Sequence, residues 1–414
     1  MDTAILPLWR HADFLKFWAS HTVSQIGSQV TFLALPLTAI LTTDATAGEM
    51  GLLAAMSSLP PLLFGLHAGV IVDRRHRRPL IIVSDVGRAC LLGTIPVAWL
   101  AGLLTMEWLY VIAFLTGALS LLAGLAHQAL LPAVVARERL VDANSKMALT
   151  ATAAEVAGPT LASTLVQFFT APVAIAADAL SYVVSALLLS RTRVTEPDRA
   201  PLRGRIRNEI MEGLRLALGD TRLRSLIGAR VLLNFFNAMI EAVFVLFIIR
   251  ELGVAVGLIG IIFSIGGVGF LVGAVAPARL AKRIGVGPSM VLGITIVALS
   301  DLIVPLAVGA PVVVMGLLVG AQFCFGIGLT IFNVNQASLR QVLVPSELLG
   351  RVGATVRVLA DALTPVGAIL GGVMGATLGL RETLIFAAVG ELIAAVWLWK
   401  SPARHVHDLP DAYD

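Results

Sequence analysis

The stretch GVIVDRRHRR, residues 69–78, decides how this chain is organised. It places a single acid, Asp73, beside four arginines, and long apolar runs flank it on both sides. A charged side chain at the centre of a bilayer is costly, so a cluster of this kind cannot lie within lipid. The stretch therefore predicts a tight loop at one membrane face, joining two membrane-spanning helices.

The composition extends this interpretation to the whole chain. Hydrophobic residues make up 57% of the sequence and charged residues only 14%, whereas soluble domains carry about 25% charged residues. The two cysteines, Cys90 and Cys324, lie far apart in apolar runs, so they predict no disulfide and no metal site. The net charge of +4 is concentrated in a few loops, and it does not indicate a nucleic-acid partner.

The apolar runs predict an all-α integral membrane protein with about twelve spans. A helix needs about 20 apolar residues to cross the hydrocarbon core, and the first run is too long for a cleavable signal peptide. The predicted spans are residues 15–41, 48–72, 79–103, 107–135, 145–169, 172–191, 223–249, 255–280, 287–309, 311–339, 349–377 and 382–400.

Lysine and arginine accumulate in alternate loops, which orients these spans. One side holds both termini, the loop at 69–78 and the basic segment 191–224, whereas the other side holds only Arg250 and Arg381. Basic loops remain on the cytoplasmic side of a membrane. We therefore expect a multi-pass protein of the cell membrane with both termini in the cytoplasm.

Residues 192–222 form the longest polar connection and divide the spans six and six. The predicted parts are an N-terminal six-helix bundle (1–191), a cytoplasmic linker (192–222), a C-terminal six-helix bundle (223–400) and a cytoplasmic tail (401–414). Apolar residues recur at every fourth position from Ile206 to Leu218, which predicts an amphipathic linker helix. Such a helix can lie on the membrane surface or be an ordinary solvated connection.

The two halves of the chain are related to each other. A shift of 209 residues without gaps takes Pro79 to Pro288 and Gly158 to Gly367. Two pseudo-symmetric six-helix repeats are an architecture of secondary transporters, which bind their substrates between the repeats near the bilayer midplane.

The loop pattern of Gly69, Asp73, Arg74, Arg77 and Arg78 resembles the signature loop between spans two and three of the major facilitator superfamily. The segments 13–15, 132–144 and 339–351 are similar to its drug-proton antiporter branch, and more narrowly to macrolide and siderophore (enterobactin-type) exporters. The resemblance implies a bacterial inner-membrane transporter that works by alternating access.

The resemblance also implies a gate at this loop. Asp73 would meet the start of span eleven, near residues 347–350, when the cytoplasmic side is closed, and Arg74 or Arg77 would pair with Glu138. The alternative is that the arginines only set the topology. His76 departs from the family, which usually has glycine there.

Span five keeps only part of the antiporter pattern. The pair Gly158-Pro159 is present, but Ala153, Ala162 and Ser163 occupy positions that are commonly glycine in the family. This departure weakens the prediction of proton antiport relative to the prediction of the fold.

Polar side chains form stripes along three spans. They are His21 and Gln25 in span one, Asn234 and Asn237 in span seven, and Gln322, Asn333 and Gln336 in span ten. In the superfamily these spans line the central cavity, so the resemblance implies that the stripes follow the substrate path. The alternative is that the amides hold helices together, at about 0.6 kcal/mol each.

Four ionisable residues within the spans are candidates for proton coupling. Glu241 and Glu155 have no basic residue one turn away on their own helices, whereas Asp361 lies one turn from Arg357. Burial without a partner favours the protonated form of a carboxyl group, so Glu241 is the first candidate, Glu155 the second and Asp361 the third.

The other buried acids have a structural interpretation. Asp85 and Arg88, three residues apart, are expected to pair. Asp178, Asp301 and Glu391 lie on spans that pack outside the cavity in the superfamily, so a buried hydrogen bond is expected for each.

Together these features predict a proton-coupled exporter of amphipathic small molecules, such as drugs, macrolides or siderophores. Its partners would be the substrate, protons and the lipid bilayer, and it would work as a monomer without metal or cofactor. A lipid or lysolipid flippase, or an importer, has the same fold. A membrane-embedded enzyme or receptor is less consistent with the sequence, which has no Gly-x-Ser-x-Gly motif or Walker-type loop, and His21 and His127 are expected to be isolated histidines.

Overall fold

The computed structural model describes residues 8–194, 196, 206–345 and 348–406. In these ranges the regular structure is helical and contains no strand. Eleven segments of the described chain are long and apolar enough to cross a membrane. The segment that falls short is α5 (Leu140–Phe168), because Glu155 and several threonine, serine and glycine residues lower the hydropathy of its apolar part. The prediction of an all-α membrane protein with about twelve spans is confirmed.

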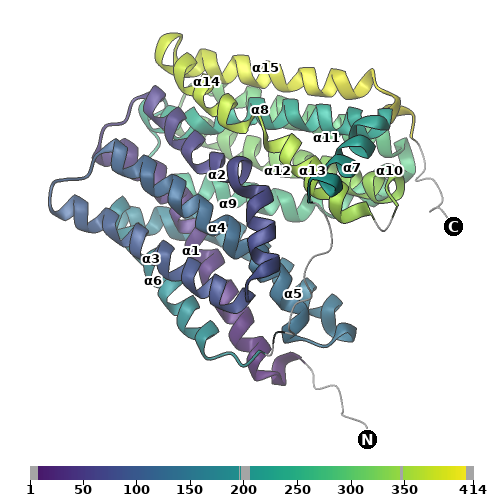
Figure 1. The fold of residues 1–414 in the computed structure, drawn as a ribbon. Helices are drawn as coiled ribbons and strands as arrows, with labels where there is room; N and C mark the ends of the chain where they lie inside the picture. Colours follow the sequence, from purple (N-terminus) through teal and green to yellow (C-terminus); the bar gives the residue numbers. More distant parts are fainter. Residues whose placement is uncertain (1–7, 195, 197–205, 346–347, 407–414) are drawn as a thin grey trace, which may run out of the picture. The chain divides into compact units, whose positions relative to one another are not determined.

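The first half of the chain contains six long helices (Figure 1). They are α1 (Ala12–Thr42), α2 (Ala47–Arg74), α3 (Arg77–Leu100), α4 (Met106–Val134), α5 and α6 (Ala171–Ser190). Short 3-10 turns at Leu8–Arg10 and Arg137–Arg139 precede α1 and α5.

The second half contains nine helical segments in its described part. They are α7 (Ile206–Gly219), α8 (Thr221–Arg250), α9 (Val256–Gly273), α10 (Ala276–Ile284), α11 (Val286–Leu306), α12 (Pro311–Leu343), α13 (Leu349–Asp361), α14 (Thr364–Thr377) and α15 (Leu380–Trp399). A 3-10 turn at Pro402–His405 follows α15.

Two predicted spans are each divided into two helices. The span at 255–280 becomes α9 and α10, and the span at 349–377 becomes α13 and α14. Pro277 and Pro365 lie in the first turns of α10 and α14. Proline lacks the amide hydrogen that a continuous helix needs and its ring clashes with the carbonyl four residues earlier, which explains both breaks.

The chain forms two compact units. The first contains Met1–Ala45, Met56–Ala200 and Val256–Gly260, and the second contains Thr46–Ala55, Pro201–Ala255 and Ile261–Asp414. In the first, Phe14, Phe17 and Leu130 lie in a fully buried core. In the second, Ile294 and Phe332 lie in another.

The two halves repeat the same helix packing, as predicted. In the first half α1 packs against α5 and α6, and α3 packs against α4 and α6. In the second half α8 packs against α14 and α15, and α11 packs against α12 and α15. These pairs are the ones that the 209-residue shift relates.

One pair of glycines shows the repeat at atomic level. A Cβ on Gly158 would lie 2.3 Å from the Cβ of Gln29 in α1, and a Cβ on Gly367 would lie 3.3 Å from the Cβ of Ala238 in α8. Gln29 and Ala238 are themselves related by the same shift. Glycine is therefore required at both positions because a neighbouring helix approaches closely.

A helix forms in the linker at the predicted place. α7 packs against α13, where Ala217 is buried, while Leu218 remains exposed. Whether its apolar face lies on a membrane surface stays a prediction. The linker residues 197–205 and the tail residues 407–414 lie outside the described residues.

Candidate functional site

The second unit contains a polar cluster built around Arg230, a residue of α8. Its Nη1 donates 2.9 Å hydrogen bonds to Oδ1 of Asn333 and Oε1 of Gln336, both on α12. Gln336 is buried, whereas Arg230 and Asn333 are half-buried. The guanidinium group is thus held by two neutral amides, which accept its hydrogen bonds without neutralising its charge.

Asp361 lies next to this cluster, at the end of α13. Its Oδ1 accepts a 2.9 Å hydrogen bond from Nδ2 of Asn234, which also approaches the carbonyl of Ala360 at 3.3 Å. Arg230 and Arg357 both act electrostatically on Asp361. Arg357, which the sequence analysis placed closest to Asp361, is exposed, and the hydrogen bond comes from Asn234. The three helices α8, α12 and α13 therefore supply an acid, a base and three amides.

The sequence analysis missed Arg230 although the signal was present. Arg230 lies four residues before Asn234 on the same helix, and residues four apart share one face. Extending the stripe of Asn234, Asn237 and Glu241 by one turn toward the N-terminus of α8 would have included it.

In the first unit, two histidines face each other across α1 and α4. The rings of His21 and His127 are 5.0 Å apart between centroids, and Phe17 lies 5.4 Å from His127. The sequence analysis did not predict this contact, which the packing of α1 against α4 creates. His127 is buried, and neither of its ring nitrogens has a hydrogen-bond partner in the described part of the chain.

A second polar network of the first unit lies between α1, α3 and α6. Arg88 pairs with Asp85 as predicted, and Asp85 also accepts a 2.6 Å hydrogen bond from Ser185 of α6. Ser185 in turn contacts Ser20 of α1 at 2.8 Å. The guanidinium of Arg88 lies 3.9 Å over the ring of Tyr182. Every charge in this network has a partner, which fits the structural role expected for it.

Asp178 has the buried hydrogen bonds that the sequence analysis expected. It accepts one from Thr31 of α1 and one of 2.9 Å from Ser181 on its own helix. These contacts hold α6 against α1 and satisfy the carboxyl group within the bundle.

The basic loop is fixed by a residue that the sequence analysis did not consider. The Glu196 carboxylate accepts hydrogen bonds of 2.8 and 2.9 Å from the backbone amides of Arg77 and Arg78, at the first turn of α3. A carboxylate at a helix N-terminus is stabilised by the helix dipole. In the sequence, the indication of this contact was the position of Glu196 in the linker, just after span six.

The arginines of the loop bind main-chain carbonyls. Arg77 donates to the carbonyl of Ala129 in α4 at 2.6 Å, and Arg78 donates to the carbonyls of Leu189 and Ser190. Gly69 is half-buried, while Asp73, Arg74 and Glu138 are exposed. The predicted meeting of Asp73 with residues 347–350 stays a prediction, and residue 347 lies outside the described residues.

Other predicted site residues lie apart from the Arg230 cluster. Glu155 and Glu241 are exposed and Gln25 is half-buried. Gln322 lies beside Gly266 of α9, about 16 Å along α12 from Asn333 at 1.5 Å per residue. Asn237 approaches Glu391 of α15. Gly158 and Pro159 are buried.

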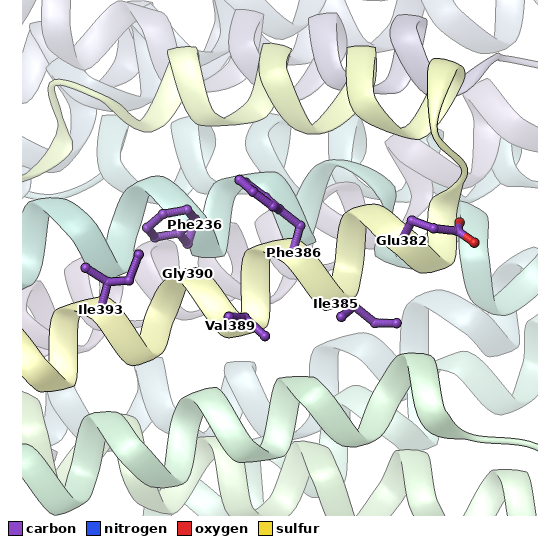
Figure 2. Close-up of a pocket in the computed structure, with 7 residues that line it drawn as sticks. All are labelled: Phe236, Glu382, Ile385, Phe386, Val389, Gly390 and Ile393. Carbon is purple, nitrogen blue, oxygen red and sulfur yellow. The ribbon is translucent and has the colours of Figure 1, made fainter.

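A groove of about 430 Å³ lies on the surface of the second unit (Figure 2). Its walls are side chains of α15 and one residue of α8. They are Phe236, Glu382, Ile385, Phe386, Val389, Gly390 and Ile393. This lining shares no residue with the predicted substrate stripes, so the groove does not mark the candidate site.

The architecture and the polar clusters define a membrane transporter of the major facilitator class. A family model described as "Transmembrane secretion effector" matches residues 3–411. The chain therefore belongs to this family of major facilitator superfamily transporters.

Similar proteins include characterised efflux systems. The multidrug efflux pump Tap of Mycolicibacterium fortuitum is 26% identical over 381 residues, covering 89% of this chain and 91% of that protein. Macrolide efflux protein A of Streptococcus pyogenes is 23% identical over 390 residues, covering 92% and 94%.

Solved structures show the same fold at low sequence identity. The nucleoside transporter NupG matches with a TM-score of 0.73 at 15% identity, covering 94% of this chain and 98% of that one. A bacterial homologue of the iron transporter ferroportin matches with a TM-score of 0.74 at 19% identity, covering 95% and 99%. The predicted fold is thus confirmed.

Proposed function

We propose that this transporter exports amphipathic small molecules across the bacterial inner membrane and that protons drive the export. Two of its relatives are named for the efflux of drugs and of macrolides. The protein would act as a monomer by alternating access, with a small-molecule substrate, protons and lipid as its partners. Transport, rather than chemical conversion of the substrate, would be its activity.

The observation that carries this proposal is the cluster of Arg230, Asn333, Gln336, Asn234 and Asp361. Ionisable groups in membrane helices are costly, and they usually mark a pathway for ions or substrates. Neutral amides hold Arg230 in place, so its charge is available to a polar substrate group. A carboxyl group lies beside it that can take up a proton. A substrate and a proton can therefore act on the same cluster.

Efflux in inverted membrane vesicles tests the proposal. A proton gradient should drive the uptake of the fluorescent drug ethidium into vesicles that contain the protein, and dissipating the gradient should abolish that uptake. Uptake that persists without a proton gradient would contradict proton coupling. The same assay compares Glu241→Gln, Glu155→Gln and Asp361→Asn, and the true proton carrier should lose driven uptake while exchange of the drug persists.

Glu382→Gln is the matched control for these variants. Glu382 is an exposed acid in the first turn of α15, and it belongs to neither the stripes nor the Arg230 cluster. This variant should transport normally. A loss of driven uptake in Glu382→Gln similar to that in the other variants would show that the assay reports folding or insertion.

We also propose that the termini and the basic loop face the cytoplasm. A cysteine at residue 75 should react only with a reagent on the cytoplasmic side, and a cysteine at residue 44 only from outside. The native Cys90 and Cys324 are both exposed, so serine replaces them in the background for this experiment. Labelling of residue 75 from outside intact cells would reverse the proposed orientation.

A further inference from the structure

Two acids lie against each other inside the second unit, away from the Arg230 cluster. Asp301 of α11 is 4% exposed and Glu391 of α15 is fully buried. The helices α11 and α15 pack against each other, and the two carboxyl groups act on each other electrostatically. An ionised carboxylate only accepts hydrogen bonds, so two ionised groups in this position could not bond and would repel each other.

The oxygens of this pair lack donors. Oδ2 of Asp301 and both carboxyl oxygens of Glu391 are buried, and no donor in the described part of the chain completes a hydrogen bond to them. A polar side chain from α8, Asn237, approaches Glu391 without good hydrogen-bond geometry. A buried carboxylate without hydrogen bonds or a counter-charge is strongly disfavoured.

The packing around the pair is close. A Cβ on Gly390, the residue before Glu391, would lie 2.3 Å from the ring of Phe236, the residue before Asn237. Figure 2 shows Phe236 beside Gly390 on the wall of the surface groove. This contact presses α15 onto α8 and leaves little space for water at Glu391.

The neighbouring helices do not compensate the charge. α8, α10, α12, α14 and the 3-10 turn at Pro402–His405 pack against α11 or α15. None of the described bases of these elements acts on either carboxyl group; they are Arg222, Arg224, Arg230, Arg250, Arg279, Lys282, Arg283, Arg340 and Arg404. Glu241 of α8 does not act on them either. In the described part of the chain, the groups that act on the pair are the two acids themselves and the Asn237 amide.

The equivalent place in the first unit contains a base. The shift of 209 residues takes Tyr182 to Glu391 and Arg88 to Val297. In the first unit, Arg88 neutralises Asp85 and lies over Tyr182. In the second unit, the position of the arginine is taken by the fully buried Val297. Asp85 corresponds to Ile294, and Asp301 corresponds to Leu92. The second unit therefore has acids at this helix interface at other positions and without the arginine.

We propose that Asp301 and Glu391 form a proton-binding site, in which one proton is shared between the two carboxyl groups. The proton supplies the missing donor and removes one of the two negative charges. Asn237 connects the pair to α8, the helix that carries Arg230 and Asn234. The role of this proton in transport rests on the proposed function, but its presence does not.

Infrared spectroscopy of the purified full-length protein tests the site directly. At about pH 7 the folded protein should show the C=O stretching band of a protonated carboxyl group, because the pair keeps a proton that free Asp and Glu would have released. Asp301→Asn and Glu391→Gln should each remove this band, because the amide donates to the remaining carboxylate. Glu382→Gln should keep it. A band that is unchanged in both pair variants would overturn the proposal.

Thermal unfolding gives a second readout. A folded state that holds an extra proton loses stability as the pH rises above the pKa of the unfolded acids, about 4, so the melting temperature of the wild type should fall as the pH rises from there. In Asp301→Asn this fall in melting temperature should be smaller. It should be equally small in the double variant with Asn at 301 and Gln at 391, because two amides form a hydrogen bond without an added proton. An equal fall in all proteins would contradict the shared proton.

Two further measurements separate the alternatives. The first distinguishes a shared proton from a bound sodium ion, and the second distinguishes proton binding by the pair from proton coupling of transport. If sodium ions at constant ionic strength raise the melting temperature of the wild type but not of Asp301→Asn, the pair binds sodium and the proton assignment is wrong. If vesicle transport needs no proton gradient while the infrared band behaves as expected, the proposed coupling fails and the proton-binding site stands.

Discussion

The side-chain amide of Asn234 donates a 2.9 Å hydrogen bond to the carboxyl group of Asp361. This bond joins the middle of α8 to the last residue of α13, just before the break that separates α13 from α14. The acid is therefore held where the helix is interrupted, and a change in its protonation alters the bond that holds α13 to α8.

Removing the donor should weaken this connection. Asn234→Ala deletes a hydrogen bond to a charged group, which contributes about 1.5–3 kcal/mol, so we expect a lower melting temperature and slower drug efflux. The control is Asn144→Ala, because Asn144 donates to the carbonyl of Leu140 in its own helix. Equal effects of the two substitutions would show that Asn234 has no special role.

Replacing Arg230 should change which substrates are exported. Arg230→Gln removes the positive charge, and we expect about a tenfold loss of apparent affinity for an anionic siderophore, which corresponds to about 1.4 kcal/mol. Cationic ethidium should be affected much less. Arg230→Lys keeps the charge without the planar fork and should give an intermediate loss. Concentration series in vesicles measure both.

The control for Arg230 is Arg224→Gln, on the same helix but exposed. This substitution should leave both affinities unchanged. If Arg230→Gln weakens ethidium and the siderophore alike, the residue contributes to the structure of the cluster and does not select substrates by charge.

Replacing His127 should raise the stability of the protein and lower its transport rate. Its two ring nitrogens are buried without partners in the described part of the chain, and an unsatisfied buried polar group costs about 1–3 kcal/mol. His127→Phe keeps an aromatic ring against Phe17, so we expect a higher melting temperature together with reduced drug efflux. The control is Leu115→Phe, at an exposed position of α4, which should change neither. Full transport by His127→Phe would make the histidine a packing residue.

Glu196 should protect the start of α3. Glu196→Gln removes the negative charge at this helix N-terminus, an effect of about 0.3–1 kcal/mol at exposed sites, so the amides of Arg77 and Arg78 should exchange hydrogen faster. Asp73→Asn should leave those amides protected. As a test of the proposed gate, the same variant should shift spin-label distances across the membrane face that carries the basic loop. Unchanged exchange in Glu196→Gln would show that the contact is not maintained in solution.

The sequence predicted the fold well because membrane spans are long, apolar and bounded by charge. The breaks at Pro277 and Pro365 were also visible as prolines, but hydropathy averages over them and merges the flanking helices. The 209-residue shift paired Gly158 with Gly367. The structure explains why both are glycine, because a neighbouring helix approaches each of them closely.

The site was predicted less completely because it depends on contacts between helices. The partners of Arg230 lie more than 100 positions away on α12, and the contact between His21 and His127 requires α1 to pack on α4. A single sequence gives the face of a helix but not its neighbour. Glu196 was overlooked for the same reason, since its role depends on where the linker returns to α3.

The network of Ser20, Ser185, Asp85, Arg88 and Tyr182 has a mechanical consequence. Sliding α3 by one turn along α6 would leave Asp85 and Arg88 paired on α3 but would break the hydrogen bond from Ser185 to Asp85. A hydrogen bond to a charged group contributes about 1.5–3 kcal/mol. Polar contacts as well as apolar packing therefore set the register of α1, α3 and α6. A rearrangement of the first unit that keeps this register avoids the cost of breaking them.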